Sequence, residues 1–296
     1  EAKFLITGSN AGPVEARVVE KFNQHQVLGK VYTGGLQRAQ IHAAADDIAK
    51  ALTGKPGIAQ TLIAFKVETS AQTSEIYVSD YDGFNARQVT QDRSSAVAPA
   101  WGGRTTLFYG SYKLGRLSVF SHEIGSGSRR SITSFGGSSM SPAGSPDGQR
   151  VAMILSKSGS PDLYVADRSG GNLQRLTSTK EAESSPCWSP DGKTICFASR
   201  AHGPASLYVV SAAGGEMRRL ATTGVPNATE PDWSPDGKWI VFTTMMQRFH
   251  ICLVKAGGGE ARVLVEGEDP SWAPNSRAVV FCQGPDHSKS LSLLDV

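Results

Sequence analysis

The chain has 296 residues, of which 39% are apolar and 19% charged, with 32 glycines and a formal net charge of +3. This composition is typical of a soluble β-rich protein with many tight turns, and the length allows one large domain beside a small one. No apolar run approaches the roughly 18 to 20 residues that cross a bilayer. The basic pairs Arg129-Arg130 and Arg218-Arg219 lie beside glycine-rich turns, which argues against a nucleic-acid-binding stripe.

The first 54 residues lack the repeat that occupies the rest of the chain. Three short apolar runs separated by turn residues predict strands, at residues 4–6, 16–20 and 27–32. A helix is predicted next, because Ile41, Ala45, Ile48 and Leu52 recur at helical spacing and Gly54 supplies a C-terminal stop. We therefore predict a small N-terminal α/β domain over residues 1–54. It buries so little surface that we expect it to be truncated.

From Gly57 onward one unit repeats. Its fullest form, Pro-x-Trp-Ser-Pro-Asp-Gly-Lys, stands at residues 186–193 and 231–238. A degenerate first copy is anchored near Gly57. The later Trp-equivalent positions are Trp101, Gly144, Trp188, Trp233 and Trp272, which lie at intervals of 43, 44, 45 and 39 residues. A period of about 40 to 45 residues filled with short strands is typical of a β-propeller with one four-stranded blade per repeat. The sequence predicts a mainly β fold, with a six-bladed β-propeller over residues 55–296.

The conformation of the turn and the packing of the blades explain why each residue type occurs in the repeat. Pro presets φ in the Ser-Pro-Asp-Gly turn, Asp accepts a hydrogen bond from the backbone two residues on, and Gly takes a positive φ. The Trp is expected to fill the wedge between neighbouring blades, and looser packing is expected where Gly144 replaces it. The recurring Asp147, Asp191 and Asp236 are interpreted as structural, since a catalytic pair needs two particular residues and not one per blade.

Closure of the ring is incomplete in the repeat pattern. The last copy ends at residues 291–296, which match only a third strand. A propeller must close to remove its sheet edges. Either an N-terminal segment, such as Ala51-Leu52-Thr53, supplies the missing strand, or the chain is cut short at its C-terminus.

Two of the four cysteines flank one Ser-Pro-Asp-Gly turn. Cys187 and Cys196 are equidistant from its centre, so they should face each other across a hairpin. Opposed Cβ atoms approach bonding distance at non-hydrogen-bonded positions. Two buried thiols are the favoured interpretation, and a disulfide is the alternative.

Catalytic and metal-binding motifs are scarce. The chain has no Gly-x-Ser-x-Gly elbow and no phosphate-binding loop, and His122-Glu123 lacks the second His of a zinc motif. Asp80-Tyr81-Asp82-Gly83 resembles a calcium loop only superficially and is interpreted as a plain turn. We therefore predict no catalytic residues, no metal and no cofactor.

A binding surface is the remaining candidate. In a propeller, loops that run from the fourth strand of one blade to the innermost strand of the next surround one mouth of the central channel, and loops on a rigid scaffold often carry function. The later loops are acidic. The candidate partner-binding residues are Asp92, Arg93, Lys180, Glu181, Glu183, Asn227, Thr229, Glu230, Glu266, Glu268 and Asp269.

Nearly the whole chain resembles the TolB family, the periplasmic propeller proteins of the Tol-Pal envelope system. The resemblance rests on the helix ending in Lys50-Ala51-Leu52-Thr53-Gly54, the phrase Ser79-Asp80-Tyr81-Asp82-Gly83-Phe84-Asn85 and the Ser-Pro-Asp-Gly blades. It implies a non-enzymatic periplasmic adaptor, peripheral to the outer membrane, that binds the lipoprotein Pal at the channel mouth and contacts TolA through an N-terminal segment. The implied roles are envelope integrity, outer-membrane constriction at division and protein import.

Against this resemblance, we expect the first part of the family's α/β domain and the closing strand to be absent from the chain, which puts TolA binding in doubt. Two other classes stay open. One is the propeller of a prolyl-oligopeptidase-like serine peptidase whose hydrolase domain is absent, and the other is a propeller enzyme with a metal in its channel.

Overall fold

The computed structural model describes residues 2–133, 137–285 and 288–296. The chain forms two compact units, one of Glu1–Ile63 with Val78–Arg87 and the other of Ala64–Tyr77 with Gln88–Val296. The domain boundary at residue 54 stays a prediction. The single helix in the described part of the chain is neither long nor apolar enough to cross a membrane.

The first unit contains an antiparallel sheet in the order β1 (Phe4–Ser9), β2 (Val14–Glu20) and β3 (Gln26–Tyr32), followed by α1 (Gln37–Thr53). Alternate residues of the sheet pack with Ala44 of the helix in one small apolar cluster. The helix ends at Gly54, whose φ of 73° lets its N–H reach Lys50 O at 2.9 Å. The three strands, the helix and its glycine stop are confirmed.

The Asp80–Gly83 segment also belongs to this unit. Gly83 N–H donates to Asp80 O at 2.9 Å, and Gly83 has a φ of 81°, so the segment is a tight turn. Its carboxylates bind the helix, since Arg38 Nη2 lies 2.5 Å from Asp82 Oδ2 and Arg38 Nε lies 3.2 Å from Asp80 Oδ2. The turn at residues 80–83, which is part of the sequence on which the family resemblance rests, is therefore joined to α1 by ion pairs.

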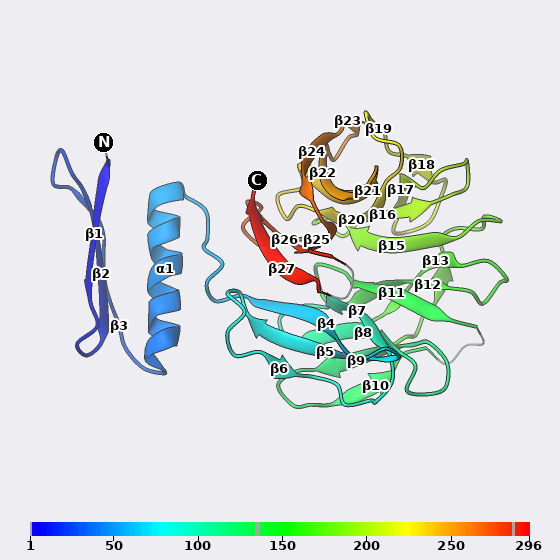
Figure 1. Cartoon of the computed structure of the whole chain (residues 1–296), viewed down its shortest axis with the longest axis horizontal. Coiled ribbons are helices and arrows are strands. Elements are labelled where there is room, and N and C mark those ends of the chain that lie inside the picture. The colour runs from blue at the N-terminus through cyan, green and yellow to red at the C-terminus, as the bar shows by residue number, and fades with distance from the viewer. Residues whose placement is uncertain (1, 134–136, 286–287) are drawn as a thin grey trace. The chain divides into compact units, whose positions relative to one another are not determined.

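The other strands form six blade sheets within the described residues, arranged as a propeller (Figure 1). The mainly β propeller fold is confirmed. In chain order the sheets are β4 (Leu62–Ser70), β5 (Thr73–Asp80) and β6 (Arg87–Gln88); β7 (Ala96–Trp101), β8 (Thr106–Ser111), β9 (Ser118–Glu123) and β10 (Arg129–Ser131); β11 (Ser139–Gly144), β12 (Arg150–Leu155), β13 (Asp162–Asp167) and β14 (Gln174–Arg175); β15 (Glu183–Trp188), β16 (Thr194–Ser199), β17 (Ser206–Ser211) and β18 (Arg218–Arg219); β20 (Thr229–Trp233), β21 (Trp239–Met245), β22 (Phe249–Lys255) and β24 (Arg262–Glu266); and β25 (Glu268–Trp272), β26 (Ala278–Gln283) and β27 (Ser290–Asp295). A short parallel pair joins β19 (Thr222–Thr223) to β23 (Gly259–Glu260).

The Ser-Pro-Asp-Gly turns form as the sequence predicts. In the fourth blade, Asp191 Oδ1 accepts from the Lys193 N–H at 3.1 Å and from Ser189 Oγ at 2.6 Å. Gly192 has a φ of 67°, and its N–H donates to Ser189 O at 2.9 Å. The same bonds recur around Asp147 and Asp236. The recurring carboxylates are therefore turn residues.

Packing at the Trp-equivalent positions agrees with the prediction at one site and corrects it at another. Trp188 is buried among side chains of the third and fourth blades, and its Nε1–H donates to Ala143 O at 2.9 Å. The expectation of looser packing at Gly144 is wrong. A Cβ there would lie 2.5 Å from Gly102 Cα and 2.6 Å from Trp101 O, so neighbouring backbones meet where a larger residue would keep them apart.

The inner strands of the second to sixth blades share one bulge. In each of them the ladder to the next strand shifts register three residues before the Trp-equivalent position. The residue there has a φ near +50°, at Ala98, Ser141, Ser185, Glu230 and Asp269. A bulge leaves one residue unpaired and re-aims its side chain. The two acidic members of this set, Glu230 and Asp269, are both candidate site residues.

The first copy of the repeat differs from the prediction. Residues 55–61 form no strand, so the innermost position expected near Gly57 is not filled by that segment. Instead Ala59 N–H donates to Asp46 Oδ1 at 2.7 Å on α1. The suggestion that Ala51-Leu52-Thr53 closes the ring is also wrong, because these residues form the last turn of α1.

Cys187 and Cys196 face each other in register on β15 and β16, as predicted, and both are buried free thiols. The disulfide alternative is therefore not what the structure shows. The Ser189 N–H donates to Thr194 O, and alternation along the ladder then places Cys187 and Cys196 at a hydrogen-bonded position. Opposed residues are more widely spaced there, which disfavours a bridge. Burial and the adjacent Cys196 thiol raise the pKa of Cys187.

Candidate functional site

The candidate site lies at the end of the propeller opposite the Ser-Pro-Asp-Gly turns. Because four strands alternate in direction, the turn from second to third strand shares an end with the loop to the next blade. Hydrogen bonds between these turns and the loops to the next blade confirm that they lie side by side. Tyr112 N–H, in a second-to-third-strand turn, donates to Ser95 O at 3.1 Å, and Ser156 N–H donates to Ser138 O at 3.0 Å. We call this end, with its loops and turns, the channel mouth.

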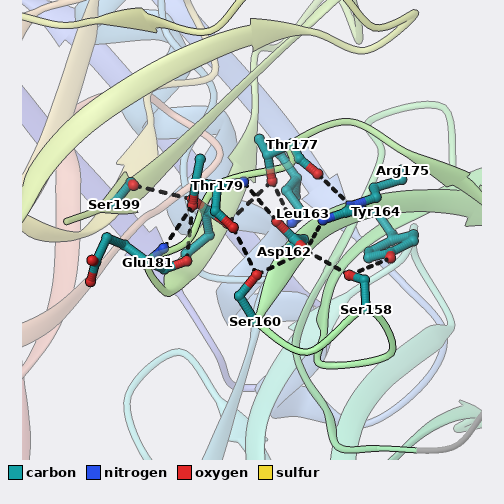
Figure 2. A network of polar contacts seen from close by, with 11 residues as sticks. Ser158, Ser160, Asp162, Leu163, Tyr164, Arg175, Thr177, Thr179, Glu181 and Ser199 are labelled. Atoms are coloured by element: carbon teal, nitrogen blue, oxygen red, sulfur yellow. Dashed lines mark hydrogen bonds and ion pairs between the residues drawn. The ribbon is translucent and has the colours of Figure 1, made fainter. Parts of the chain in front are cut away.

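A buried polar network fixes the loop between the third and fourth blades (Figure 2). At its centre is Asp162, the first residue of β13, which is fully buried. Its Oδ2 accepts from Arg175 Nη2 at 2.6 Å and from Ser158 Oγ at 2.7 Å, and its Oδ1 accepts from Thr179 N–H at 3.2 Å. One carboxylate thus connects β13, β14, the neighbouring turn and the loop that leads to β15.

Glu183, a predicted site residue, belongs to the same network. Its side chain accepts from the hydroxyls of Thr179 at 2.7 Å, Ser199 at 3.2 Å and Thr177 at 3.2 Å, and the residue is 1% exposed. Burial and the charge of Asp162 raise the pKa of Glu183, although its hydroxyl donors oppose the rise. The carboxylate is thus used inside the protein, and it orders the loop on which Lys180 and Glu181 are exposed.

The loop between the first and second blades is fixed by a similar arrangement. Glu75 is buried and accepts from Thr90 Oγ1, from Asp92 N–H at 3.2 Å and from Arg93 N–H at 2.9 Å. The side chain of Asp92, a predicted site residue, is 1% exposed and lies 2.8 Å from both Arg129 Nη1 and Ser111 Oγ. Burial opposes ionisation of Asp92, but these donors outweigh it and lower its pKa. Arg93 is exposed.

Between the fifth and sixth blades the carboxylates are arranged differently. Glu230 and Asp269 occupy the bulge positions of β20 and β25, and Asp269 N–H donates to Glu230 Oε2 at 3.2 Å. Glu268 is paired with Lys289. Asp269 is open to solvent, yet surrounding protein and the charges of Glu230 and Glu268 raise its pKa to about 6. We call Glu230, Glu268 and Asp269 the acidic sector.

Asp232 lies two residues beyond the bulge and joins the same two inner strands. Its Oδ2 accepts from Trp272 N–H at 2.7 Å. Burial raises its pKa to about 6, and hydrogen bonds from the Trp272 backbone and the Ser271 side chain limit the rise. The junction of the fifth and sixth blades therefore holds two carboxylates, Asp232 and Asp269, that resist ionisation.

The remaining predicted residues hold the second-to-third-strand turn of the fifth blade. Asn227 Oδ1 accepts from Met245 N–H at 2.8 Å, and Asn227 Nδ2 donates to Met245 O at 2.9 Å. Thr229 Oγ1 donates to Thr243 O at 3.4 Å. Glu266 Oε1 lies 2.8 Å from Arg248 Nη1 in that turn. All eleven predicted residues thus lie in loops or strand ends at the channel mouth, and their assignment to a partner stays a prediction.

Sequence reasoning missed the buried carboxylates Glu75 and Asp162, which support these loops. Each stands at or near the start of the third strand of its blade, directly ahead of the apolar run. This position predicts a buried carboxylate only weakly, because Ser118 and Ser206 occupy the corresponding position in other blades. In the described parts of the chain, no group of three or more His, Cys, Asp or Glu side chains is placed to hold a metal ion.

Comparisons with known proteins agree with this architecture. A family model described as the TolB beta propeller domain matches residues 49–296. The Tol-Pal system protein TolB of Desulfosudis oleivorans is 32% identical over 177 residues, which cover 57% of this chain and 40% of that protein. A TolB homolog of Chlamydia abortus is 31% identical over 187 residues, covering 56% and 44%. The matched segment thus spans less than half the length of these curated relatives.

A solved structure covers more of the fold. The crystal structure of TolB from Acinetobacter baumannii superposes with a TM-score of 0.86 at 25% identity, over 99% of this chain and 76% of that one. The family model covers well over half of the chain, including every blade and the whole channel mouth. The chain therefore belongs to the TolB beta-propeller family.

Proposed function

We propose that this chain is a non-enzymatic adaptor of the Tol-Pal system that works in the periplasm and binds the lipoprotein Pal at the channel mouth. Membership of the TolB propeller family supports this proposal, together with relatives whose names place them in the Tol-Pal system. The cellular roles that follow are outer-membrane integrity, constriction at division and protein import. Contact with TolA through an N-terminal segment belongs to the same proposal.

One observation carries the proposal most directly, namely that the loops of the mouth are held in place before any partner arrives. Asp162, Glu183 and Glu75 are buried and bonded to the loop backbone and hydroxyls. A loop ordered in advance loses less conformational entropy on binding. The arrangement therefore suits the capture of a second protein.

The exposed members of the predicted set are the expected contacts. Asp92 and Glu183 are bonded within the protein, whereas Arg93, Lys180, Glu181 and Asp269 are exposed to solvent. Glu230 and Asp269 share a hydrogen bond, and the positive charges of Lys289 and Lys66 only partly offset the rise in the pKa of Asp269. A positive group on the partner would relieve the crowding that raises the pKa of Asp269.

The proposal is tested with a double charge reversal, Glu230→Lys with Asp269→Lys. Glu268 is left alone because it already pairs with Lys289. Titration calorimetry measures binding of the purified folded domain of Pal. The affinity should fall at least about tenfold, because two negative charges of the acidic sector become positive. Circular dichroism should show an unchanged propeller.

A matched control reverses two exposed acids at the other end of the blades, Glu216→Lys with Glu260→Lys. This variant has the same net charge, so it should bind like the unchanged chain. Equal affinities for all three proteins would remove the acidic sector from the proposal. Failure of the unchanged chain to bind Pal would overturn the proposed function itself.

A further inference from the structure

Exposed apolar side chains gather on two turns of the channel mouth. In the second blade, Tyr112 and Leu114 are exposed in the turn between β8 and β9. In the fifth blade, Met245, Met246 and Phe249 are each more than 40% exposed in the hairpin between β21 and β22. The corresponding turns of the third and fourth blades carry Lys157-Ser158-Gly159 and Arg200-Ala201-His202-Gly203. We call the two apolar turns the blade-2 anchor and the blade-5 anchor.

The blade-5 anchor is held rigidly although it is exposed. Met245 pairs with Phe249 across the hairpin, and Asn227 bonds both the N–H and the carbonyl of Met245. Arg248, between them, is tied to Glu266. Large apolar side chains that are exposed on an ordered backbone favour an interaction site, and methionine adapts its shape to a partner.

The blade-2 anchor is fastened in the same way. Gly115 N–H donates to Tyr112 O at 2.8 Å, which closes the turn, and Tyr112 N–H donates to Ser95 O. Lys113 Nζ lies 3.4 Å from Asp92 Oδ1 in the adjoining loop. Each anchor therefore combines exposed apolar groups with one cation that is tied to a loop carboxylate of the mouth.

The two anchors lie on opposite sides of the ring. The second and fifth of six sheets are three places apart, and Figure 1 shows β8 and β9 across the propeller from β21 and β22. The acidic sector lies at the next junction after the blade-5 anchor. A peptide confined to the channel would not contact both turns, whereas a folded domain seated over the mouth would.

We propose that both anchors bind one folded protein domain, which spans the mouth, presents apolar side chains to the two turns and places a cationic group on the acidic sector. This inference rests on the proposed function and specifies the shape and chemistry of its partner. The acidic sector supplies the charge complementarity, and the anchors continue the same surface outward.

The test uses two double variants, Tyr112→Ser with Leu114→Ser and Met246→Ser with Phe249→Ser. The probe is the folded domain of Pal, titrated against each variant. Each pair should weaken binding about tenfold, because exposed anchors at an interface contribute through buried apolar area. Val263→Ser with Leu293→Ser removes two similarly exposed apolar side chains from the outermost strands of their sheets, away from the channel mouth, and this control should bind within about twofold of the unchanged chain. Thermal unfolding checks that every variant is folded.

The possible results distinguish this inference from the proposed function on which it rests. Weakened binding by both anchor pairs, with the control unaffected, supports a spanning partner. Loss at only one anchor overturns the spanning arrangement. Normal binding by both anchor variants, while reversal of Glu230 and Asp269 still abolishes capture, overturns the inference and leaves the proposed function intact. No binding by the unchanged chain overturns both.

Discussion

The junction between the third and fourth blades and the junction between the fifth and sixth blades both contain carboxylates, and the two sets behave differently. Asp162 and Glu183 are buried and receive donors from several elements. Glu230 and Asp269 lie on bulges, and the Asp269 N–H donates to the Glu230 side chain. Both are more exposed to solvent than Asp162 and Glu183. Residue type alone therefore does not assign a role to an acid at the channel mouth, because the number of its hydrogen-bond donors and its burial decide that role.

The largest effect is expected from Asp162→Ala. The substitution removes the buried carboxylate that accepts from Arg175, from Ser158 and from the Thr179 N–H. Hydrogen bonds to a charged group contribute about 1.5 to 3 kcal/mol each, and three are lost together, so the midpoint of urea unfolding should fall clearly. Glu230→Ala, which removes the acceptor of the Asp269 N–H, is the matched comparison and should cost far less. Equal losses would erase the distinction between the two junctions.

A smaller, pH-dependent effect is expected from Asp232→Asn. The folded-state pKa of Asp232 is raised to about 6, above the value near 4 of an unfolded chain. Its contribution to stability is therefore fully present below pH 4 and is lost as the pH rises through 6. Asn keeps an acceptor for the Trp272 N–H without the charge. The variant should gain up to about 3 kcal/mol relative to the unchanged chain between pH 4 and pH 7.

This difference is measured by urea unfolding of both proteins across that range, so that other titrating groups cancel. A stability difference that stays constant with pH would show that Asp232 ionises freely in the folded protein. Asp191→Asn, in an exposed turn, serves as the control, because the pKa of Asp191 is lowered by Ser189 and the Lys193 N–H and its contribution is instead lost on acidification below pH 4.

The smallest effect is expected from Asp269→Asn. Surrounding protein and Glu230 raise the pKa of Asp269 to about 6, so stability from this group also declines as the pH rises from 4 to 6. Solvent screens the site, which makes the change in stability modest. Titration of the side chain by NMR should instead show a midpoint near 6 that falls when Glu230→Gln removes the neighbouring charge. An unmoved midpoint would mean that Glu230 does not contribute and that burial and Glu268 cause the shift.

Local chemistry explains why so much of the fold could be predicted. The Ser-Pro-Asp-Gly turn is specified by consecutive residues, and all of its expected bonds are present around Asp191. The helix and its stop at Gly54 follow from spacing and from glycine's tolerance of a positive φ. The facing of Cys187 and Cys196 follows from counting outward from a turn. Each of these features needs information from only a few neighbouring residues.

The same sequence determined the period, the turns, the strands and the family to which the repeats belong, because each depends on residues close together in the chain. Only the tertiary structure decided which carboxylates became supports and which remained open, that the segment at Gly57 binds α1 instead of forming a strand, and that the backbone at Gly144 is closely packed. It also decided that Tyr112 and Met246, more than 130 residues apart, lie at one end of the same ring. These outcomes depend on how distant strands stack and on which donors reach each buried acid.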